Sequence, residues 1–289
     1  MSMNVGIPQT PSRRIAKQFE DRLRSAPDRH LAARMSRLVS AIAKLVEEER
    51  VDRADLRALI RFATEVGHAS DARRSEWVLL ADTLGITSLV EQQVTRRPPG
   101  ATPNTIAGPF YRTEAPARRD GESISIDGIG EPLVLTLQIS DLDGDPVADA
   151  LIEVWQANAD GVYENQAPDL QPDGNLRGRF RSGDDGRVIV RTVRPKGYAI
   201  PSDGPVGELM KRLGLSPNRP AHLHFRISAA GFETLTTHLF DSEDPALDAD
   251  PLFAVDPALV IRFDPCGAGG YETSHRFILA RAHPGYEDT

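Results

Sequence analysis

The 289-residue sequence has a single cysteine, Cys266, so it cannot form an intramolecular disulfide. No run approaches the roughly 20 apolar residues that a membrane-spanning helix needs, and we therefore expect no membrane span. Positive charge is not in excess either, because 34 Lys and Arg stand against 42 Asp and Glu, a formal net charge of −8. That balance argues against a nucleic-acid-binding protein. Residues 1–14 hold no apolar run behind their basic residues, which predicts no secretory signal and a cytoplasmic location.

Proline and glycine are scarce in the first part of the chain and abundant afterwards. Between Asp28 and Arg97 there is no proline and there are only two glycines, whereas residues 101–289 hold 17 prolines and 19 glycines. The charge balance changes at the same place, from +4 over residues 1–100 to −12 over the remainder. We therefore predict two domains, residues 1–100 and residues 101–289.

The two parts also differ in hydrophobic periodicity. Between residues 31 and 45, apolar residues recur at spacings of four and three, which predicts an amphipathic helix. Its apolar face consists of Leu31, Met35, Leu38, Ile42 and Leu45. Two uses of this face stay open at this point: packing within the protein, and self-association.

The second part predicts short strands separated by turns rich in Gly, Pro and Asp. The candidate strands cover residues 133–139, 151–155, 187–193, 222–227, 234–240, 258–263 and 276–279. Because no helical pattern separates these strands, an antiparallel sandwich or barrel is favoured. The predicted fold is thus mainly β, an antiparallel β-sandwich behind an N-terminal α-helical domain.

Histidine and tyrosine offer the best candidates for a functional site. His222 and His224 lie two apart in a predicted strand, so both imidazoles point to one face and can bind one metal ion. No carboxylate follows closely, since the next acidic residue is Glu233, and a single cysteine excludes a thiolate-rich zinc site. Tyr163 and Tyr198 each follow a predicted strand in a turn-rich segment, and a phenolate is a hard donor that favours Fe(III). From the residues alone, the remaining ligands stay open.

Three motifs in this order resemble the intradiol ring-cleavage dioxygenases. They are W-Q-A-N-A-D-G-V-Y over residues 155–163, P-K-G-Y over 195–198 and R-P-A-H-L-H-F over 219–225. The lead-in G-P-F-Y over residues 108–111 is similar too, and the resemblance covers roughly residues 30–280. Within the family, the run beginning W-Q-A-N, residues 200–207 and the T-T-H of residues 236–238 resemble the hydroxyquinol 1,2-dioxygenase branch.

The resemblance implies a non-haem Fe(III) site in a β-sandwich catalytic domain. One Fe(III) per subunit would be held by Tyr163, Tyr198, His222 and His224. Tyr198 would also take a proton from the substrate, and Arg219 would stabilise negative charge on the substrate ring. The implied reaction is intradiol cleavage of hydroxyquinol (benzene-1,2,4-triol) by O2 to 3-hydroxy-cis,cis-muconate or its tautomer maleylacetate, in aromatic compound degradation. The alternatives are a catechol or chlorocatechol 1,2-dioxygenase giving cis,cis-muconate, and an iron-free β-sandwich carrier.

The resemblance also implies a substrate pocket and an assembly. Asp82 would accept a hydrogen bond from the third hydroxyl of hydroxyquinol, which catechol lacks. The full set of expected substrate-binding residues is Leu79, Asp82, Ile106, Ala107, Gly108, Pro109, Phe110, Ile200, Pro201, Arg219 and Leu252. At positions 77 and 107, the residues Trp77 and Ala107 differ from those of many relatives. Both could affect which aromatic diol the pocket accepts. The implied assembly is a homodimer through the N-terminal helices, with a phospholipid at the dimer interface.

Overall fold

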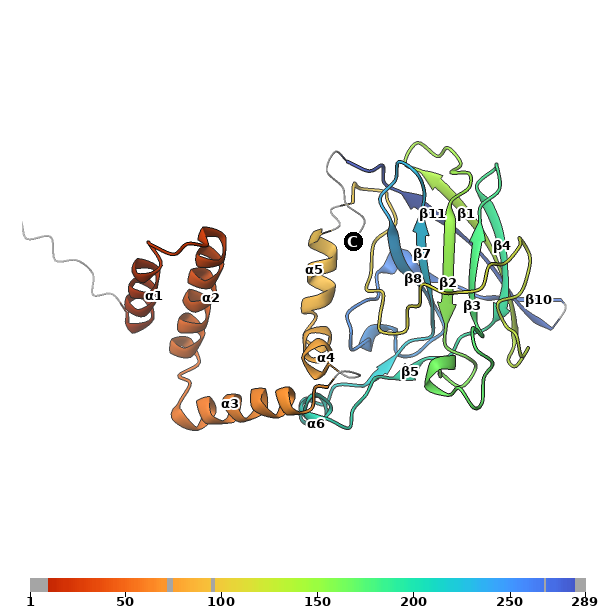
Figure 1. Ribbon diagram of the computed structural model, residues 1–289. Coiled ribbons are helices and arrows are strands. Elements are labelled where there is room, and N and C mark those ends of the chain that lie inside the picture. Colours follow the sequence, from red (N-terminus) through yellow and green to blue (C-terminus); the bar gives the residue numbers. More distant parts are fainter. Residues whose placement is uncertain (1–9, 72–74, 95–96, 268, 284–289) are drawn as a thin grey trace, which may run out of the picture. The chain divides into compact units, whose positions relative to one another are not determined.

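A computed structural model describes residues 10–71, 75–94, 97–267 and 269–283 (Figure 1). The chain packs as two compact units, one ending at His68 and the other beginning at Ala69. The change in composition near Pro98 follows α5, and after it strands predominate, with one further helix at Pro205–Leu213. Among the described helices, none is both long and apolar enough to cross a membrane.

The described residues of the smaller unit form three helices, α1 (Pro11–Arg22), α2 (Arg29–Glu48) and α3 (Arg53–His68). Asp28 caps α2 by accepting a hydrogen bond from the amide of Leu31, which explains where this helix begins. The apolar face predicted between residues 31 and 45 lies on α2, and its five side chains are 37–56% exposed. Such a row of exposed apolar side chains is unusual for a surface that stays in water.

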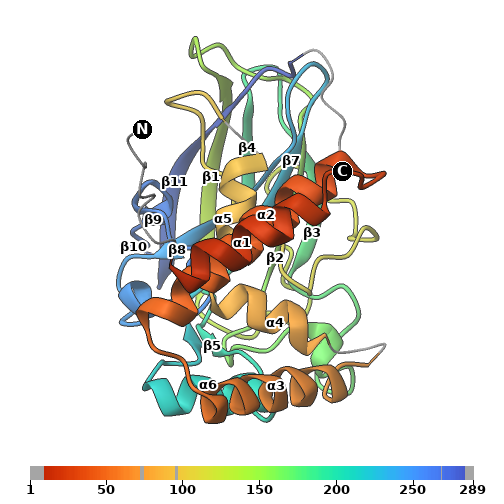
Figure 2. The ribbon, with the colours of Figure 1, turned by 90° about the vertical axis from the view of Figure 1, so that its left-hand side faces the viewer.

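The larger unit holds three further helices, α4 (Glu76–Thr83), α5 (Ile86–Val94) and α6 (Pro205–Leu213). The Ser75 hydroxyl caps α4 at the amide of Val78. The buried carboxylate of Glu76 accepts a hydrogen bond of 3.0 Å from the amide of Val206 and so joins α4 to α6. Figures 1 and 2 show α5 above α4, with α6 at the lower end of the unit near β5 (Tyr198–Ala199).

The strands of the larger unit form a sandwich of two sheets, as predicted. The four-stranded sheet has the order β10 (Asp264–Cys266), β11 (Gly270–Leu279), β1 (Pro132–Asp141), β4 (Arg187–Val193). The five-stranded sheet has the order β3 (Arg177–Arg181), β2 (Leu151–Gln156), β7 (His222–Ser228), β8 (Leu235–Asp241), β9 (Val260–Ile261). A short pair joins β5 to β6 (Asn218–Arg219), and three 3-10 turns lie at Glu164–Gln166 (η1), Leu247–Ala249 (η2) and Pro257–Leu259 (η3).

Pairing in the sandwich is mixed rather than purely antiparallel. β1 runs parallel to β11 and β8 runs parallel to β9, while the other pairs of the two large sheets are antiparallel. Strand periodicity reports which side chains share a face and carries no information about the neighbouring strand. The direction of these two pairs therefore follows from the path of the chain.

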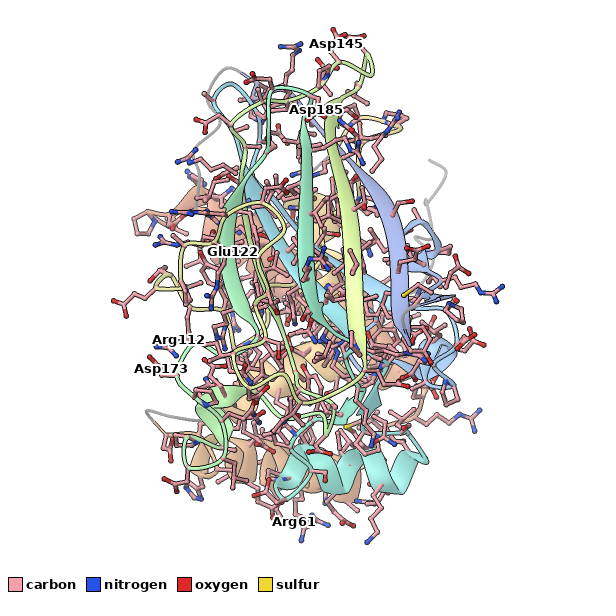
Figure 3. All side chains as sticks on the ribbon, turned by 90° about the vertical axis from the view of Figure 1, so that its right-hand side faces the viewer. Arg61, Arg112, Glu122, Asp145, Asp173 and Asp185 are labelled. Atoms are coloured by element: carbon pink, nitrogen blue, oxygen red, sulfur yellow. The ribbon has the colours of Figure 1, made fainter. Side chains whose placement is uncertain are left out.

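One face of the five-stranded sheet packs in the core between the two sheets, and the other face is available for a site. On β7, Leu223, Phe225 and Ile227 are fully buried in that core. Since side chains alternate along a strand, His222 and His224 lie on the opposite face. They are at the end of the strand where β5 and β6 lie, whereas the turn around Asp145 lies at the far end of the sandwich (Figure 3).

Candidate metal centre

Two imidazoles from β7 meet at one point. The Nε2 atoms of His222 and His224 are 3.2 Å apart, and both residues are buried. The Nδ1–H of His222 donates to the carbonyl of Pro220 at 2.7 Å, which makes Nε2 the unprotonated nitrogen that can bind a metal. Burial lowers the pKa of both imidazoles well below 6.5, with further lowering by Arg219. Both rings are therefore neutral, the form that binds metals.

A third histidine lies beside this pair. His238 on β8 is opposite His224 in the strand register, and its ring centroid is 4.2 Å from that of His224. Its Nδ1 hydrogen-bonds with the buried hydroxyl of Thr105, while its Nε2 is buried without a hydrogen-bond partner. The ligand atoms of His222, His224 and His238 all lie within 4.8 Å of one another. His238 was not predicted as part of the site, because its position beside His224 depends on the register between β7 and β8.

Two tyrosines reach the same point from neighbouring loops. Tyr163 and Tyr198 have ring centroids 5.6 Å apart, and Tyr198 is 5.6 Å from His222 by the same measure. The loops touch at Gly161, where φ is +78° and an added Cβ would lie 2.7 Å from the carbonyl oxygen of Gly197. Only glycine permits this conformation and this approach together, so Gly161 sets the spacing of the two tyrosines.

The donor set fits a single metal ion. A separation of 3.2 Å is about the distance expected between two imidazole nitrogens that share one ion at roughly 2.1 Å. The Tyr163 hydroxyl is buried without a hydrogen-bond partner, and burial, followed by the nearby Tyr198, raises the pKa of Tyr163 well above 10. A buried polar atom without a partner is costly, and a cation bound here would remove that cost. Two phenol oxygens and two imidazoles suit a hard, highly charged ion.

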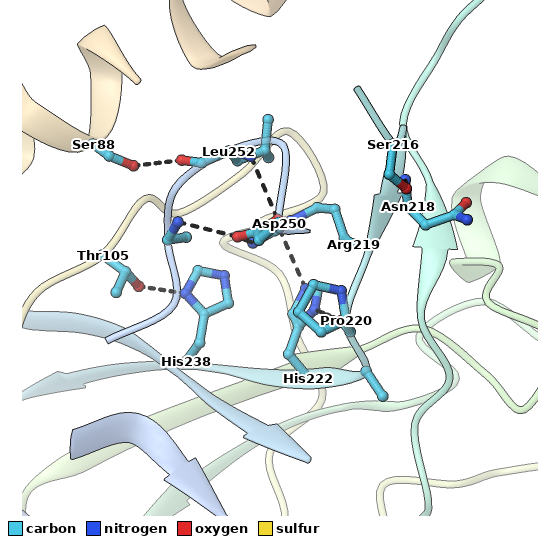
Figure 4. Close-up of polar contacts among 12 residues, drawn as sticks. Ser88, Thr105, Ser216, Asn218, Arg219, Pro220, His222, His238, Asp250 and Leu252 are labelled. Atoms are coloured by element: carbon cyan, nitrogen blue, oxygen red, sulfur yellow. Dashed lines mark hydrogen bonds and ion pairs between the residues drawn. The ribbon is translucent and has the colours of Figure 1, made fainter. Parts of the chain in front are cut away.

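Arg219 brings a fixed positive charge to the centre. Its side chain is 1% exposed, and its Nη1 lies 3.4 Å from Nε2 of His222 (Figure 4). Burial opposes the charge, but Tyr198 and Asp250 raise the pKa of Arg219 above its ordinary value. The guanidinium therefore stays charged without contact with water.

The segment before Tyr111 covers the centre. The amide of Thr105 donates to the carbonyl of Thr236 on β8 at 2.8 Å, which fixes the start of this segment. Gly108 has φ of +73°, and a Cβ there would lie 3.4 Å from Cε1 of His224. Phe110 then stacks on the ring of Tyr163, with centroids 4.2 Å apart. The backbone of Gly108 thus passes directly over a candidate ligand.

Comparison with known proteins identifies the family. Residues 106–279 match the family model described as Dioxygenase, and residues 28–102 match the model described as Catechol dioxygenase N terminus. The chain belongs to the intradiol ring-cleavage dioxygenase family. This dioxygenase is therefore an oxidoreductase, and the resemblance drawn from the three motifs is confirmed. The family is typically iron-dependent, in agreement with the donor set.

The relatives of this dioxygenase share nearly its full length. The hydroxyquinol 1,2-dioxygenase of Rhizobium sp. (strain MTP-10005) is 41% identical over 280 residues, which are 93% of this chain and 95% of that protein. The 6-chlorohydroxyquinol 1,2-dioxygenase of Cupriavidus pinatubonensis is 38% identical over 92% of this chain and 96% of that protein. The structure of hydroxyquinol 1,2-dioxygenase from Pseudomonas putida DLL-E4 is similar at a TM-score of 0.89 and 36% identity, covering 94% and 99% of the two chains.

The remaining pocket residues predicted for this dioxygenase come from four places in the larger unit: α4, the segment before Tyr111, the residues after β5 and the loop after η2. Leu79 and Asp82 are half-buried on α4, where burial raises the pKa of Asp82 and a hydrogen bond with Thr87, followed by the charge of Arg219, opposes that effect. Ile106, Ile200 and Leu252 are buried, and the Leu252 carbonyl accepts a hydrogen bond from Ser88 at 2.6 Å. Ala107, Pro109, Pro201 and the divergent Trp77 are exposed. Contact of these residues with a bound ring stays a prediction.

A buried ion pair in the dioxygenase supports Tyr163 and was not predicted from the sequence. Glu164, next to Tyr163, accepts hydrogen bonds from Arg177 at 2.6 and 2.9 Å, and both side chains are 2% exposed. Arg177 also donates to the carbonyl of Phe110 at 2.6 Å, and Arg112 adds a second cation to Glu164 at 2.9 Å. The network joins the loop of Tyr163 to the segment above the centre.

Proposed function

We propose that this dioxygenase cleaves hydroxyquinol between its two adjacent hydroxyl-bearing carbons with O2. The product would be 3-hydroxy-cis,cis-muconate or its tautomer maleylacetate, in the degradation of aromatic compounds. The names of the relatives at 41%, 38% and 36% identity support the substrate class. The observation that carries the chemistry is the convergence of a neutral imidazole pair, an unpartnered buried phenol and a buried guanidinium at one point.

The proposed ligands of one Fe(III) per subunit are Tyr163, Tyr198, His222 and His224. Their support is the 3.2 Å separation of the two Nε2 atoms and the position of both tyrosine rings beside them. Fe(III) bound here would act as a Lewis acid toward a chelated diol. Two phenolates offset most of its charge, so the centre can remain buried.

The two tyrosines differ in burial, which supports different roles for them. Tyr163 is 1% exposed and is fixed by the ion pair next to it, whereas Tyr198 is half-buried at the start of the two-residue strand β5. We therefore assign to Tyr198 the ability to move and to accept a substrate hydroxyl proton at Oη. Arg219, fixed beside His222, would stabilise the negative charge that this proton transfer leaves on the ring oxygen.

Asp82 is the residue proposed to recognise the third hydroxyl of hydroxyquinol and so to set the preference for this substrate over catechol. Its carboxylate is half-buried on α4, and the charge of Arg219 acts on it. The carboxylate also hydrogen-bonds with Thr87. The third hydroxyl of hydroxyquinol would donate a further hydrogen bond to it, whereas catechol would leave that acceptor position unfilled, which favours hydroxyquinol. Asp82→Ala is expected to abolish the preference for hydroxyquinol. Asp82→Asn keeps a carbonyl acceptor at this position and should retain part of the preference, so an unchanged ratio in both variants contradicts the role.

The primary test is O2 uptake by the iron-loaded protein with hydroxyquinol and with catechol, each corrected for autoxidation without enzyme. Strong preference for hydroxyquinol supports the proposal. Equal or faster turnover of catechol moves the assignment to a catechol or chlorocatechol dioxygenase. A colourless protein that holds no iron and consumes no O2 would be a carrier, because tyrosinate bound to Fe(III) gives a red-brown charge-transfer colour. Arg219→Ala should lower kcat with iron content unchanged.

We propose that residues 1–100 are the dimerisation domain and residues 101–289 the catalytic domain, a functional division that differs from the packing boundary after His68 because α4 and α5 belong to the larger unit. The exposed apolar row on α2 supports a homodimer, and a phospholipid would cover apolar surface at the same interface. Light scattering should give twice the chain mass at micromolar concentration, and extraction into organic solvent followed by mass spectrometry should release the lipid. A monomeric protein would refute both the homodimer and the phospholipid at its interface. The cytoplasmic location stays a prediction.

A further inference from the structure

Asp250 is a buried carboxylate that holds Arg219 and is absent from the residues expected at the site. It follows η2, and its side chain is 2% exposed. Its Oδ1 accepts a hydrogen bond from Nε of Arg219 at 3.1 Å, and its Oδ2 lies 3.5 Å from Nη2 (Figure 4). Since Asp250 is 31 residues from Arg219 along the chain, this pairing exists only in the folded protein.

The same carboxylate organises the loop that carries Leu252. The amide of Leu252 donates to Oδ1 at 3.4 Å, and the amide of Ala254 donates to Oδ2 at 3.0 Å. The carbonyl of Leu252 in turn accepts the hydroxyl hydrogen of Ser88 on α5 at 2.6 Å. A single carboxylate therefore connects a charged group at the metal centre with a proposed wall of the substrate pocket.

The pairing determines which edge of the guanidinium faces the centre. Nε and Nη2 are directed to Asp250, so Nη1 is the nitrogen left beside Nε2 of His222, at 3.4 Å. A planar guanidinium keeps its nitrogens in a fixed fork, and a carboxylate on one edge therefore aims the other edge. A charge that stabilises a reacting oxygen must be oriented before the reaction to be effective.

We propose that Asp250 is a positioning residue that orients the guanidinium of Arg219 toward the substrate. The same carboxylate fixes the position of Leu252 relative to Arg219. Asp250 acts on the reaction through Arg219 and touches no reacting atom itself. The inference rests on the proposed role of Arg219. Arg219 itself supplies the charge, and Asp250, on a separate loop, sets the orientation of that charge.

The test is kinetic and is made on the iron-loaded full chain. Asp250→Asn keeps the shape of the side chain but weakens its hold on the guanidinium, and a group displaced by about 1 Å can cost roughly 100-fold in rate. We expect kcat for hydroxyquinol to fall by about 10- to 100-fold, with iron content unchanged. The dissociation constant from an anaerobic titration, in which no turnover occurs, should change far less than kcat.

A double-mutant cycle separates positioning from a general structural effect. If Asp250 acts through Arg219, then Asp250→Asn adds no further loss of kcat to Arg219→Ala. Multiplicative losses overturn the proposal, as does a wild-type kcat in Asp250→Asn. Should Asp250→Asn fail to fold, Asp250→Glu serves in the same cycle, because it keeps the charge and displaces it by one methylene.

The chain offers a matched control at the other end of the sandwich. Asp141 accepts a hydrogen bond from the amide two residues on at 3.0 Å and from Nη2 of Arg281 at 2.6 Å, and it lies next to the turn of Asp145 (Figure 3). Asp141→Asn is expected to leave kcat unchanged. Failure of the proposed function gives a different result from failure of this inference. In that case the wild-type protein would not turn over hydroxyquinol, or Arg219→Ala would keep the wild-type kcat, whatever the effect of Asp250→Asn.

Discussion

The ion pair beside Tyr163 allows a stability prediction whose size follows from burial. Glu164 and Arg177 are each 2% exposed, and Arg177 makes three hydrogen bonds of 2.6–2.9 Å, two to Glu164 and one to the carbonyl of Phe110. Removing one partner of a buried pair leaves the other charged and desolvated, at a cost of about 3–5 kcal/mol. We expect Glu164→Gln, which leaves the buried Arg177 without its carboxylate, to lower the free energy of unfolding by that amount. Arg177→Met should lower it by less, because Glu164 keeps its contact with Arg112.

Arg112 provides the comparison within the same network. It contacts Glu164 at 2.9 Å and Asp173 at 2.8 Å, but its side chain is 32% exposed and that of Asp173 is 86% exposed. Water solvates this guanidinium in both states, and such pairs contribute less than about 1 kcal/mol. Arg112→Ala should therefore cost far less than Arg177→Met, although both remove a cation from the same carboxylate.

Urea unfolding of the iron-loaded protein measures these differences, with the slope against urea as a check that the unfolded state is unchanged. The double variant Glu164→Leu with Arg177→Met removes both charges and should be more stable than Arg177→Met alone. Equal costs for Arg112→Ala and Arg177→Met would refute the argument from burial. A shift of the tyrosinate absorption band in Arg177→Met but not in Arg112→Ala would link the pair to the position of Tyr163.

Four further outcomes are expected. Burial raises the pKa of Asp82, so its ionised form costs stability once the pH exceeds its ordinary 3.8; Asp82→Asn should make unfolding at pH 7 require more urea. Burial lowers the pKa of His275 to about 4, so its contribution to stability is present above pH 6.5 and is lost as the pH falls toward 4. His275→Leu should remove up to about 3 kcal/mol of that acid dependence, measured by urea unfolding at pH 7.5 and 4.5. Gly108→Ala should cost about 1–2 kcal/mol by backbone strain and change the absorption of the iron site, because its Cβ would contact His224. Chelation of iron under reducing conditions should abolish colour and O2 uptake and lower the melting temperature, with recovery on adding Fe(III).

The sequence by itself determined the α2 helix, most of the sandwich strands and the local geometry of the first two candidate ligands, but it missed α6 and β3. Apolar spacing of four and three predicted the apolar face of α2, and alternation along β7 placed His222 and His224 on one face. The change in proline and glycine content marked the end of the run of helices α1 to α5. The motifs were sufficient to recognise the family, because each of them is a short continuous run of residues that can be read from the sequence.

Only the tertiary structure decided which distant residues meet at those elements. His238 joins the site because β8 pairs with β7 in a register that sets it opposite His224. Asp250 reaches Arg219, and Arg177 reaches Glu164, through loops whose paths leave no periodic signal. The parallel pairing of β1 with β11 is hidden for the same reason. Periodicity follows from the geometry of a single strand or helix, whereas register and loop path depend on the packing of the whole unit.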